Sequence, residues 1–196
     1  MNYYFLDFPR DPWGDYGSVL QHGLCTQDKK AGVVRLRRTG PYVPPISNPV
    51  FSLVVTEALR RDLEASGLSG LRFVKVVKEK IVELDWQSWN RKAEWPHVMP
   101  ESGEPEDYID ERPHTKALAA QIGDLWSIQL SLVAKVGRDR RVVSSRKELW
   151  AVGQTLGDLD FVGSRDVGLA MVSQRAKDWL TPRVGKLVVF EELTVR

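Results

Sequence analysis

Residues 48–84 read NPVFSLVVTEALRRDLEASGLSGLRFVKVVKEKIVEL, and this stretch decides the fold. The apolar, β-branched run at 49–55 predicts a strand. Thr56 follows as an N-cap, and leucines then recur at helical spacing until Gly67 ends the helix. Beyond it, apolar residues alternate with Arg and Lys through 71–78, as in a partly buried strand. The stretch therefore predicts a strand, a short amphipathic helix and a second strand.

The same order of elements recurs near the C-terminus. VGLAMVS (167–173) leads into QRAKDWLTP (174–182) and then KLVVFEELTV (186–195), and a shift of 117 residues places Ser173 on Thr56. Two explanations fit this recurrence: a duplicated strand-helix-strand unit, or two unrelated units of a common type. With either explanation, the elements predict an α+β fold, in which a mixed sheet is covered by short amphipathic helices.

Length and composition predict one globular domain spanning residues 1–196. The chain is 42% hydrophobic and 28% charged, and is large enough for a sizeable core. Within it, a half at 1–90 and a half at 115–196 are separated by an acidic, proline-broken loop at 91–114. A loop of this length inside a domain is usually functional or mobile.

Charge and cysteine content exclude several classes of protein. The 28 Lys and Arg residues against 26 Asp and Glu give a net charge of +2, too little to hold nucleic acid by charge alone. Cys25 is the single cysteine, which excludes an internal disulfide and a four-cysteine zinc site. No apolar run approaches the roughly 20 residues of a membrane helix, and no secretory signal is visible at the start. We therefore expect a cytoplasmic protein without a metal or other cofactor.

Recognisable catalytic motifs are missing as well. The histidines, His22, His97 and His114, form no metal-hydrolase pattern, and His22 with Cys25 makes only an isolated HxxC pair. The glycine-rich nucleotide-binding motifs and the GxSxG serine-hydrolase motif are also lacking. These observations favour a protein that is not an enzyme and has no catalytic residues.

A binding surface is the alternative that the central segment suggests. Trp86, Trp89 and Trp95 stand among polar and charged residues, and aromatic anchors rimmed by charge are typical of protein-binding hot spots. The segment that follows supplies the other predicted contact residues: Glu101, Glu104, Glu106, Asp107, Tyr108, Asp110 and Glu111. Two plainer interpretations remain open: the acids form only a solvated loop, and Trp86 and Trp89 only cover one face of the sheet.

Two stretches, EALRRDLEASGLSGLRF (57–73) and VSQRAKDWLTPRVGKLVVFEELTVR (172–196), resemble a bacterial immunity-protein family that has a double CxxCG motif and is found beside polymorphic toxins. That family ends in a pattern similar to F-x-E-L-x-x-R, here Phe190, Glu192, Leu193 and Arg196. Both CxxCG pairs are missing from this chain, so no metal-binding residue carries over. The resemblance implies a protein that binds and neutralises a cognate toxin by blocking its active site or its access to substrate.

The acidic segment would suit a basic toxin such as a nuclease, because opposite charge speeds association. Three alternatives stay open: another protein-binding module, a small enzyme that reverses a toxin's modification, and a homodimer formed through the tryptophan-rich face. A nucleic-acid-binding module would instead place Arg35, Arg37, Arg38 and the arginines of 138–147 on one face. We rank the immunity protein first and expect no nucleic-acid or membrane partner.

Overall fold

The computed structural model describes every residue except 1, 29–31, 50–51, 139–148, 165–167 and 169. The chain divides into two compact units. The first unit comprises Met1–Pro9, Asp62–Arg72 and Gln129–Arg196, and the second comprises Arg10–Arg61 and Phe73–Ile128. The acidic segment 91–114, expected to join two halves of the chain, thus lies inside the second unit.

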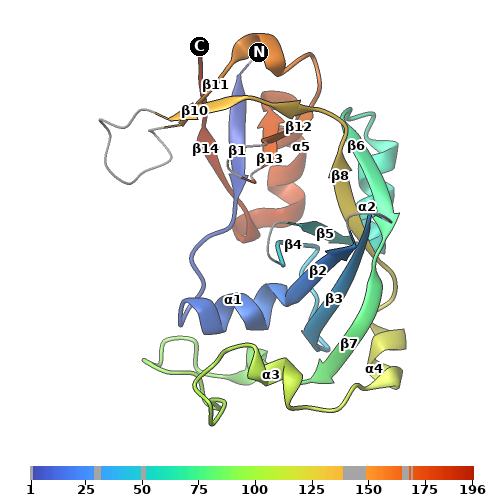
Figure 1. Cartoon of the computed structure of the whole chain (residues 1–196), viewed down its shortest axis with the longest axis vertical. Helices are drawn as coiled ribbons and strands as arrows, with labels where there is room; N and C mark the ends of the chain where they lie inside the picture. Colours follow the sequence, from blue (N-terminus) through green and yellow to red (C-terminus); the bar gives the residue numbers. More distant parts are fainter. Residues whose placement is uncertain (1, 29–31, 50–51, 139–148, 165–167, 169) are drawn as a thin grey trace. The chain divides into compact units, whose positions relative to one another are not determined.

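A five-stranded sheet with the order β14-β1-β13-β12-β9 forms the centre of the first unit (Figure 1). Its strands are β1 (Tyr3–Asp7), β9 (Val133–Ala134), β12 (Phe161–Ser164), β13 (Ala170–Ser173) and β14 (Val189–Glu192). β1 is antiparallel to both of its neighbours, β13 and β14. Helix α5 (Gln174–Val184) connects these two neighbours. The predicted C-terminal strand-helix-strand unit is therefore present, with β1 inserted between its strands.

A cluster of apolar side chains packs this unit. Phe5 and Met171 from adjacent strands are both fully buried in it, together with Leu149 and Leu193. Leu149 begins a strand of a small sheet ordered β10-β11-β15, and Leu193 directly precedes another. The strands of this sheet are β10 (Val136–Arg138), β11 (Leu149–Ala151) and β15 (Thr194–Val195). Apart from Arg138, the arginines of 138–147 fall outside the described residues. Two short 3-10 helices, η3 (Gly153–Thr155) and η4 (Gly185–Leu187), also belong to this unit.

The second unit contains a three-stranded sheet ordered β2-β3-β7. The strands are β2 (Leu24–Asp28), β3 (Val33–Gly40) and β7 (Val77–Glu83). β3 is antiparallel to β2 and parallel to β7. The other elements of this region are α1 (Asp15–His22), η1 (Trp86–Ser88), α3 (Asp107–Asp110) and α4 (Lys116–Gln121).

A four-stranded sheet ordered β4-β5-β8-β6 carries the first predicted strand-helix-strand unit. It consists of β4 (Ile46–Ser47), β5 (Leu53–Thr56), β6 (Leu71–Lys75) and β8 (Leu125–Leu130), and α2 (Glu57–Ala65) follows β5. Sequence alternation predicted one continuous strand beyond residue 71, but the chain breaks between β6 and β7. The break is at Val76, a buried residue whose N–H donates to the Leu125 carbonyl over 2.9 Å. The chain changes sheets there because β6 lies beside β8 whereas β7 pairs with β3.

The α+β prediction is confirmed, with mixed sheets and short helices. Thr56 and Ser173 both act as the predicted N-caps: their side-chain oxygens accept from the backbone N–H of Leu59 and Ala176, over 3.4 and 3.1 Å. Among the described helices, none combines the length and the apolar character that crossing a membrane requires.

Candidate functional site

An aromatic cluster in the second unit supports the segment that sequence analysis singled out. Trp86 is 3% exposed and Tyr108 is fully buried, and both pack in one core with Val19, Leu20 and Val82. The Trp86 ring meets Tyr42 edge-on at 5.9 Å between centroids. Neither side chain is available to a partner in this structure. Trp86 and Tyr108, two of the predicted contact residues, therefore belong to the core beneath the surface.

The loop between η1 and α3 is held to this core at several points. Trp13 Nε1 donates to the carbonyl of Ala93 over 2.9 Å, and the Tyr108 hydroxyl donates to the carbonyl of Val98. The Trp89 ring packs against both Trp13 and His97, at centroid distances of 6.1 Å. The prolines at 96 and 100 are buried. The proline-rich loop therefore has a defined path without regular secondary structure.

Three large apolar side chains project from that loop, and we call residues 95–99 the apolar loop. Trp95 is 60% exposed, Met99 40% and Val98 37%. Two exposed glutamates, Glu94 and Glu101, flank the apolar loop. Of the three tryptophans predicted to contact a partner, Trp95 is the one that the structure leaves open to solvent, while Trp89 is half-buried. An exposed Trp followed directly by a buried proline, in a loop with a defined path, resembles a binding anchor rather than a core residue.

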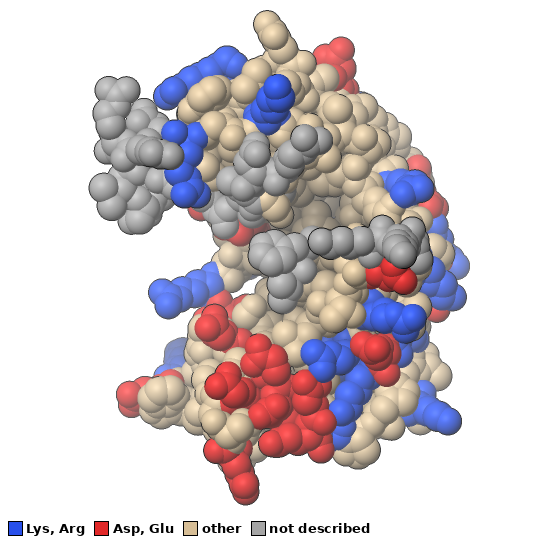
Figure 2. All heavy atoms as spheres, in the orientation of Figure 1, with Lys and Arg blue, Asp and Glu red and all other residues tan. Residues whose placement is uncertain are grey.

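The acidic residues lie on the same unit, and part of their segment is helical. α3 (Asp107–Asp110) forms where the prolines were expected to prevent regular structure. Its buried residues, Tyr108 and Ile109, explain why it forms, because they pack against the sheet core. Glu101, Glu104, Asp110 and Glu111 are exposed, whereas Glu106 and Asp107 are half-buried. Figure 2 shows acidic side chains crowded on the face where Figure 1 draws α3.

Neighbouring groups partly neutralise some of these acids. Asp110 accepts a hydrogen bond and ion pair from Arg37, and Asp107 accepts from the Ser102 hydroxyl. Within the described part of the chain, Glu104 and Glu106 make no ion pair. The charges of Glu104 and Glu106 are therefore not offset by an ion pair within the described chain and can act on another molecule.

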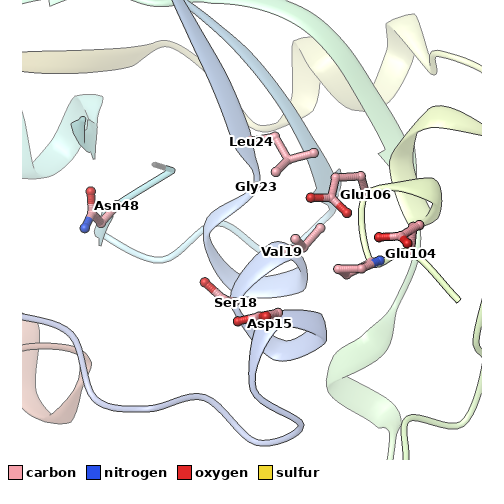
Figure 3. Close-up of a pocket in the computed structure, with 9 residues that line it drawn as sticks. Asp15, Ser18, Val19, Gly23, Leu24, Asn48, Glu104 and Glu106 are labelled. Atoms are coloured by element: carbon pink, nitrogen blue, oxygen red, sulfur yellow. The ribbon is translucent and has the colours of Figure 1, made fainter. Parts of the chain in front are cut away.

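Glu104 and Glu106 also line a cavity of about 290 Å³ between α1 and the loop that precedes α3 (Figure 3). Asp15 and Ser18 come from α1, and Asn48 contributes from the segment before β5. The full lining is Asp15, Ser18, Val19, Gly23, Leu24, Asn48, Glu104, Pro105 and Glu106. Three carboxylates around one recess create a negative potential, to which an amide and a hydroxyl add neutral hydrogen-bonding groups. A lysine or arginine side chain fits this chemistry.

His22 and Cys25 do not form a reactive pair. His22 is buried, with Nε2 3.4 Å from the Asp11 carboxylate and Nδ1 accepting from the Asn48 N–H over 3.4 Å. The Cys25 thiol donates to the Pro49 carbonyl over 2.6 Å. Burial raises the pKa of Cys25, and a hydrogen bond with Ser52 only partly offsets this, so the thiol stays protonated. No group of His, Cys, Asp and Glu residues in the described chain is arranged to hold a metal ion.

The arginines of β3 do not share the face that a nucleic-acid site needs. Arg35 is exposed and Arg37 pairs with Asp110, but Arg38 is fully buried. Its guanidinium donates to the backbone carbonyls of Thr39, Gln21 and Tyr42. Burial lowers the pKa of Arg38 to about 10. Arg140, Arg141 and Arg146, which would complete the basic face, lie outside the described residues.

Sequence analysis missed several members of this surface. Val98 and Met99 carry a local signal, since they are apolar residues in a charged, proline-rich loop. Asp15, Ser18 and Asn48 carry none, because only the folded chain brings them to Glu104 and Glu106. Comparison with known proteins adds no assignment: no family model, curated protein or solved structure matches this chain.

Proposed function

We propose that this chain is an immunity protein that binds a cognate bacterial toxin and occludes its active site or its access to substrate. One observation carries the proposal: an exposed apolar loop, held in place by buried residues, lies on the same unit as an acidic surface and an acidic recess. The resemblance of 57–73 and 172–196 to the double-CxxCG immunity proteins supports the same conclusion.

The apolar loop supplies the anchor of the proposed interface. Protein interfaces concentrate their binding energy in a few buried aromatic or arginine residues, which are surrounded by contacts that exclude water. Among the described residues of this unit, Trp95 is the largest exposed apolar side chain, and Val98 and Met99 extend the patch along the loop. Because the loop is already fixed to Trp13 and Tyr108, binding orders few additional groups, which lowers the entropic cost of association.

The acids determine which partner is attracted. Glu104 and Glu106, with Asp15 across the recess, offer carboxylates to a lysine or arginine of the toxin. A basic partner is expected if the toxin is a nuclease, because an active site that accepts phosphates carries positive charge. Attraction between opposite charges also raises the association rate, and an immunity protein must bind before its toxin acts.

Occlusion requires no chemistry from this chain. The proposed mechanism is occupancy: the apolar loop and the acidic residues cover the toxin's site, without a catalytic residue, metal or cofactor on this side. A typical specific interface covers about 800 Å² per partner, so the surface must extend well beyond Trp95. We propose that Glu101, Asp110 and Glu111, all exposed, form its rim.

Co-expression tests the proposal. The product of the neighbouring gene is expressed in cells with this chain, with a variant combining Trp95→Ala, Glu104→Gln and Glu106→Gln, or with a control combining Val77→Ala, Glu191→Gln and Glu192→Gln. The control removes equal charge and one exposed apolar side chain, but none of its residues belongs to the proposed surface.

The proposal predicts that the natural chain and the control restore growth and co-purify with the toxic product, and that the combined variant does neither while remaining folded. A harmless neighbour, or a toxic one that the natural chain does not neutralise, would refute the proposal. Equal rescue by all three chains would refute the proposed surface.

A further inference from the structure

Two parts of the chain contain the same five elements in the same order. Residues 3–75 run through β1, β4, β5, α2 and β6, and residues 125–192 run through β8, β12, β13, α5 and β14. Other elements intervene between the first and second members of each series, namely α1, β2 and β3 in one and β9, β10, β11 and η3 in the other. The agreement thus extends beyond the strand-helix-strand unit visible in the sequence.

The sheets arrange these elements identically. One sheet has the order β6-β8-β5-β4, and the other has β14-β1-β13-β12 along the corresponding strands. In the second, β1 is antiparallel to β13 and β14, and β12 is antiparallel to β13. In the first, β8 and β4 are both antiparallel to β5. Hydrogen bonds from Val76 N–H to the Leu125 carbonyl, and from Ser131 N–H to the Gly70 carbonyl, make β6 antiparallel to β8 as well.

The registers also correspond. Thr56 lies opposite Leu125 and Ser173 opposite Tyr3, so each N-cap faces the first residue of the middle strand. The first helical residue then donates its N–H to the carbonyl just before that strand. These bonds run from Glu57 to Asp124 over 3.2 Å and from Gln174 to Asn2 over 3.0 Å. A generic strand-helix-strand unit does not require this bond. The accepting carbonyl belongs to the chain before the middle strand, which is not part of the contiguous strand-helix-strand stretch.

Side chains repeat the correspondence one residue further along. Lys177 Nζ lies 3.8 Å from the centre of the Tyr4 ring, and Arg60 Cζ lies 4.5 Å from that of Trp126. Tyr4 and Trp126 are the second residues of their middle strands, and Lys177 and Arg60 are the fourth residues of their helices. Both sheets therefore place a helix cation on an aromatic ring at the same position.

We infer that the chain is a tandem repeat whose two copies have exchanged their first strands. β1 belongs by chain order to the first repeat but completes the sheet of the second, and β8 does the reverse. Exchange of identical elements between copies is a familiar route to paired domains, and here both copies belong to one chain. The segment 76–124, which carries the apolar loop and the acidic residues of the proposed binding surface, lies between the two repeats in the chain and belongs to neither.

Disulfide trapping in the full-length chain tests the exchange. Asp7 lies opposite Val189 on β1 and β14, and the Arg72 side chain bonds that of Gln129 on β6 and β8. Cross-strand residues are about 4.5–5.5 Å apart at Cα, which a disulfide can span. In a Cys25→Ser background, exchange predicts intramolecular disulfides in the Asp7→Cys/Val189→Cys and Arg72→Cys/Gln129→Cys variants. Without exchange, β1 would pair with β6 and β8 with β14, and disulfides would form in the Asp7→Cys/Arg72→Cys and Gln129→Cys/Val189→Cys variants instead. That result, or disulfides that form only between two separate chains, would overturn the exchange within one chain.

Matched substitutions test the equivalence of the repeats. Tyr4 corresponds to Trp126, whereas its neighbour Tyr3 corresponds to Leu125. Equivalence predicts that Tyr4→Trp with Lys177→Arg changes Tm by less than about 3 °C, whereas Tyr3→Trp lowers it by more than about 6 °C. A loss for the first variant as large as that for the second would overturn the equivalence.

Discussion

The Tyr108 hydroxyl donates a hydrogen bond to the backbone carbonyl of Val98 and so joins a fully buried aromatic residue to the exposed apolar loop. Burial raises the pKa of Tyr108 to about 12, an effect that nearby Tyr16 reinforces and Arg112 opposes. The hydroxyl therefore remains a donor throughout the neutral range. This bond connects α3, which carries acids of the proposed surface, with the loop that carries Trp95.

Replacing Tyr108 by Phe removes this donor and keeps the ring. We expect the free energy of unfolding at pH 7 to fall by about 1 kcal/mol, the usual net value of one hydrogen bond. Because the pKa of folded Tyr108 lies above the ordinary value of 10, its contribution is complete below pH 10 and is lost as pH rises toward 12. Urea unfolding at several pH values measures both effects. If the natural chain and the variant lost the same free energy of unfolding at alkaline pH, Tyr108 would not be the source of that loss.

Trp95 and Trp86 are expected to respond in opposite ways to alanine substitution. Trp95→Ala should leave the free energy of unfolding within about 0.5 kcal/mol, since the side chain is 60% exposed, yet weaken partner binding at least about tenfold. Trp86→Ala should cost about 3–5 kcal/mol of stability, because it empties a core site. Urea unfolding and titration with the partner measure the two quantities. A Trp95 variant that unfolds easily or binds normally would contradict its role as anchor.

Asp160 is predicted to stabilise the first unit through its charge. The carboxylate is 4% exposed and accepts from the Ser69 N–H over 2.9 Å and from the Ser173 hydroxyl over 2.7 Å. Burial raises its pKa, but these hydrogen bonds outweigh that effect and hold the pKa below its ordinary 3.8. Asp160→Asn should therefore cost about 2–3 kcal/mol at pH 7.

The pH dependence follows from the direction of that shift. A lowered pKa in the folded state stabilises the fold above pH 3.8, and this stabilisation disappears as pH falls below that value. The Asn variant should lose less stability on acidification than the natural chain. Asp178→Asn, an exposed substitution in the same unit, serves as control and should change stability by less than about 0.5 kcal/mol. Equal effects of the two substitutions would refute the role of Asp160.

Cys25 is expected to react slowly with thiol reagents. Burial raises its pKa and the thiol donates to the Pro49 carbonyl, so little thiolate is present at pH 8. Alkylation by iodoacetamide should be at least about fivefold slower than that of free cysteine, and urea should abolish the difference. If Cys25 of the folded chain were alkylated as fast as glutathione, the conclusion that its thiol is unreactive would be contradicted.

Local signals in the sequence account for much of the fold. The caps at Thr56 and Ser173 and the alternation after Gly67 each predict an element from nearby residues, and the structure contains those elements. The break at Val76 has no local signal, since no Gly or Pro stands there. Its cause is the pairing of β6 and β7 with strands far away in the chain, so periodicity alone could not reveal it.

The candidate surface was predictable only in part. Trp95 and the acids stand out in the sequence, but the same pattern selected Trp86 and Tyr108, which the structure buries. Composition around a tryptophan does not determine its exposure: Trp86 follows a strand and packs on Tyr42, whereas Trp95 lies in a loop. The acidic recess could not be predicted from the sequence, because Asp15 lies far from Glu104 in the chain.

The most direct test of the central claim is the affinity between the purified chain and the product of the neighbouring gene, the proposed toxin, measured at two salt concentrations. Glu104→Gln with Glu106→Gln is compared with Glu191→Gln with Glu192→Gln, which makes the same charge change on β14. We predict that the first variant binds at least about tenfold more weakly at low salt and loses much of the salt dependence, while the second behaves like the natural chain. Unchanged affinity and salt dependence in the Glu104 and Glu106 variant would contradict the claim that this acidic surface recognises a toxin.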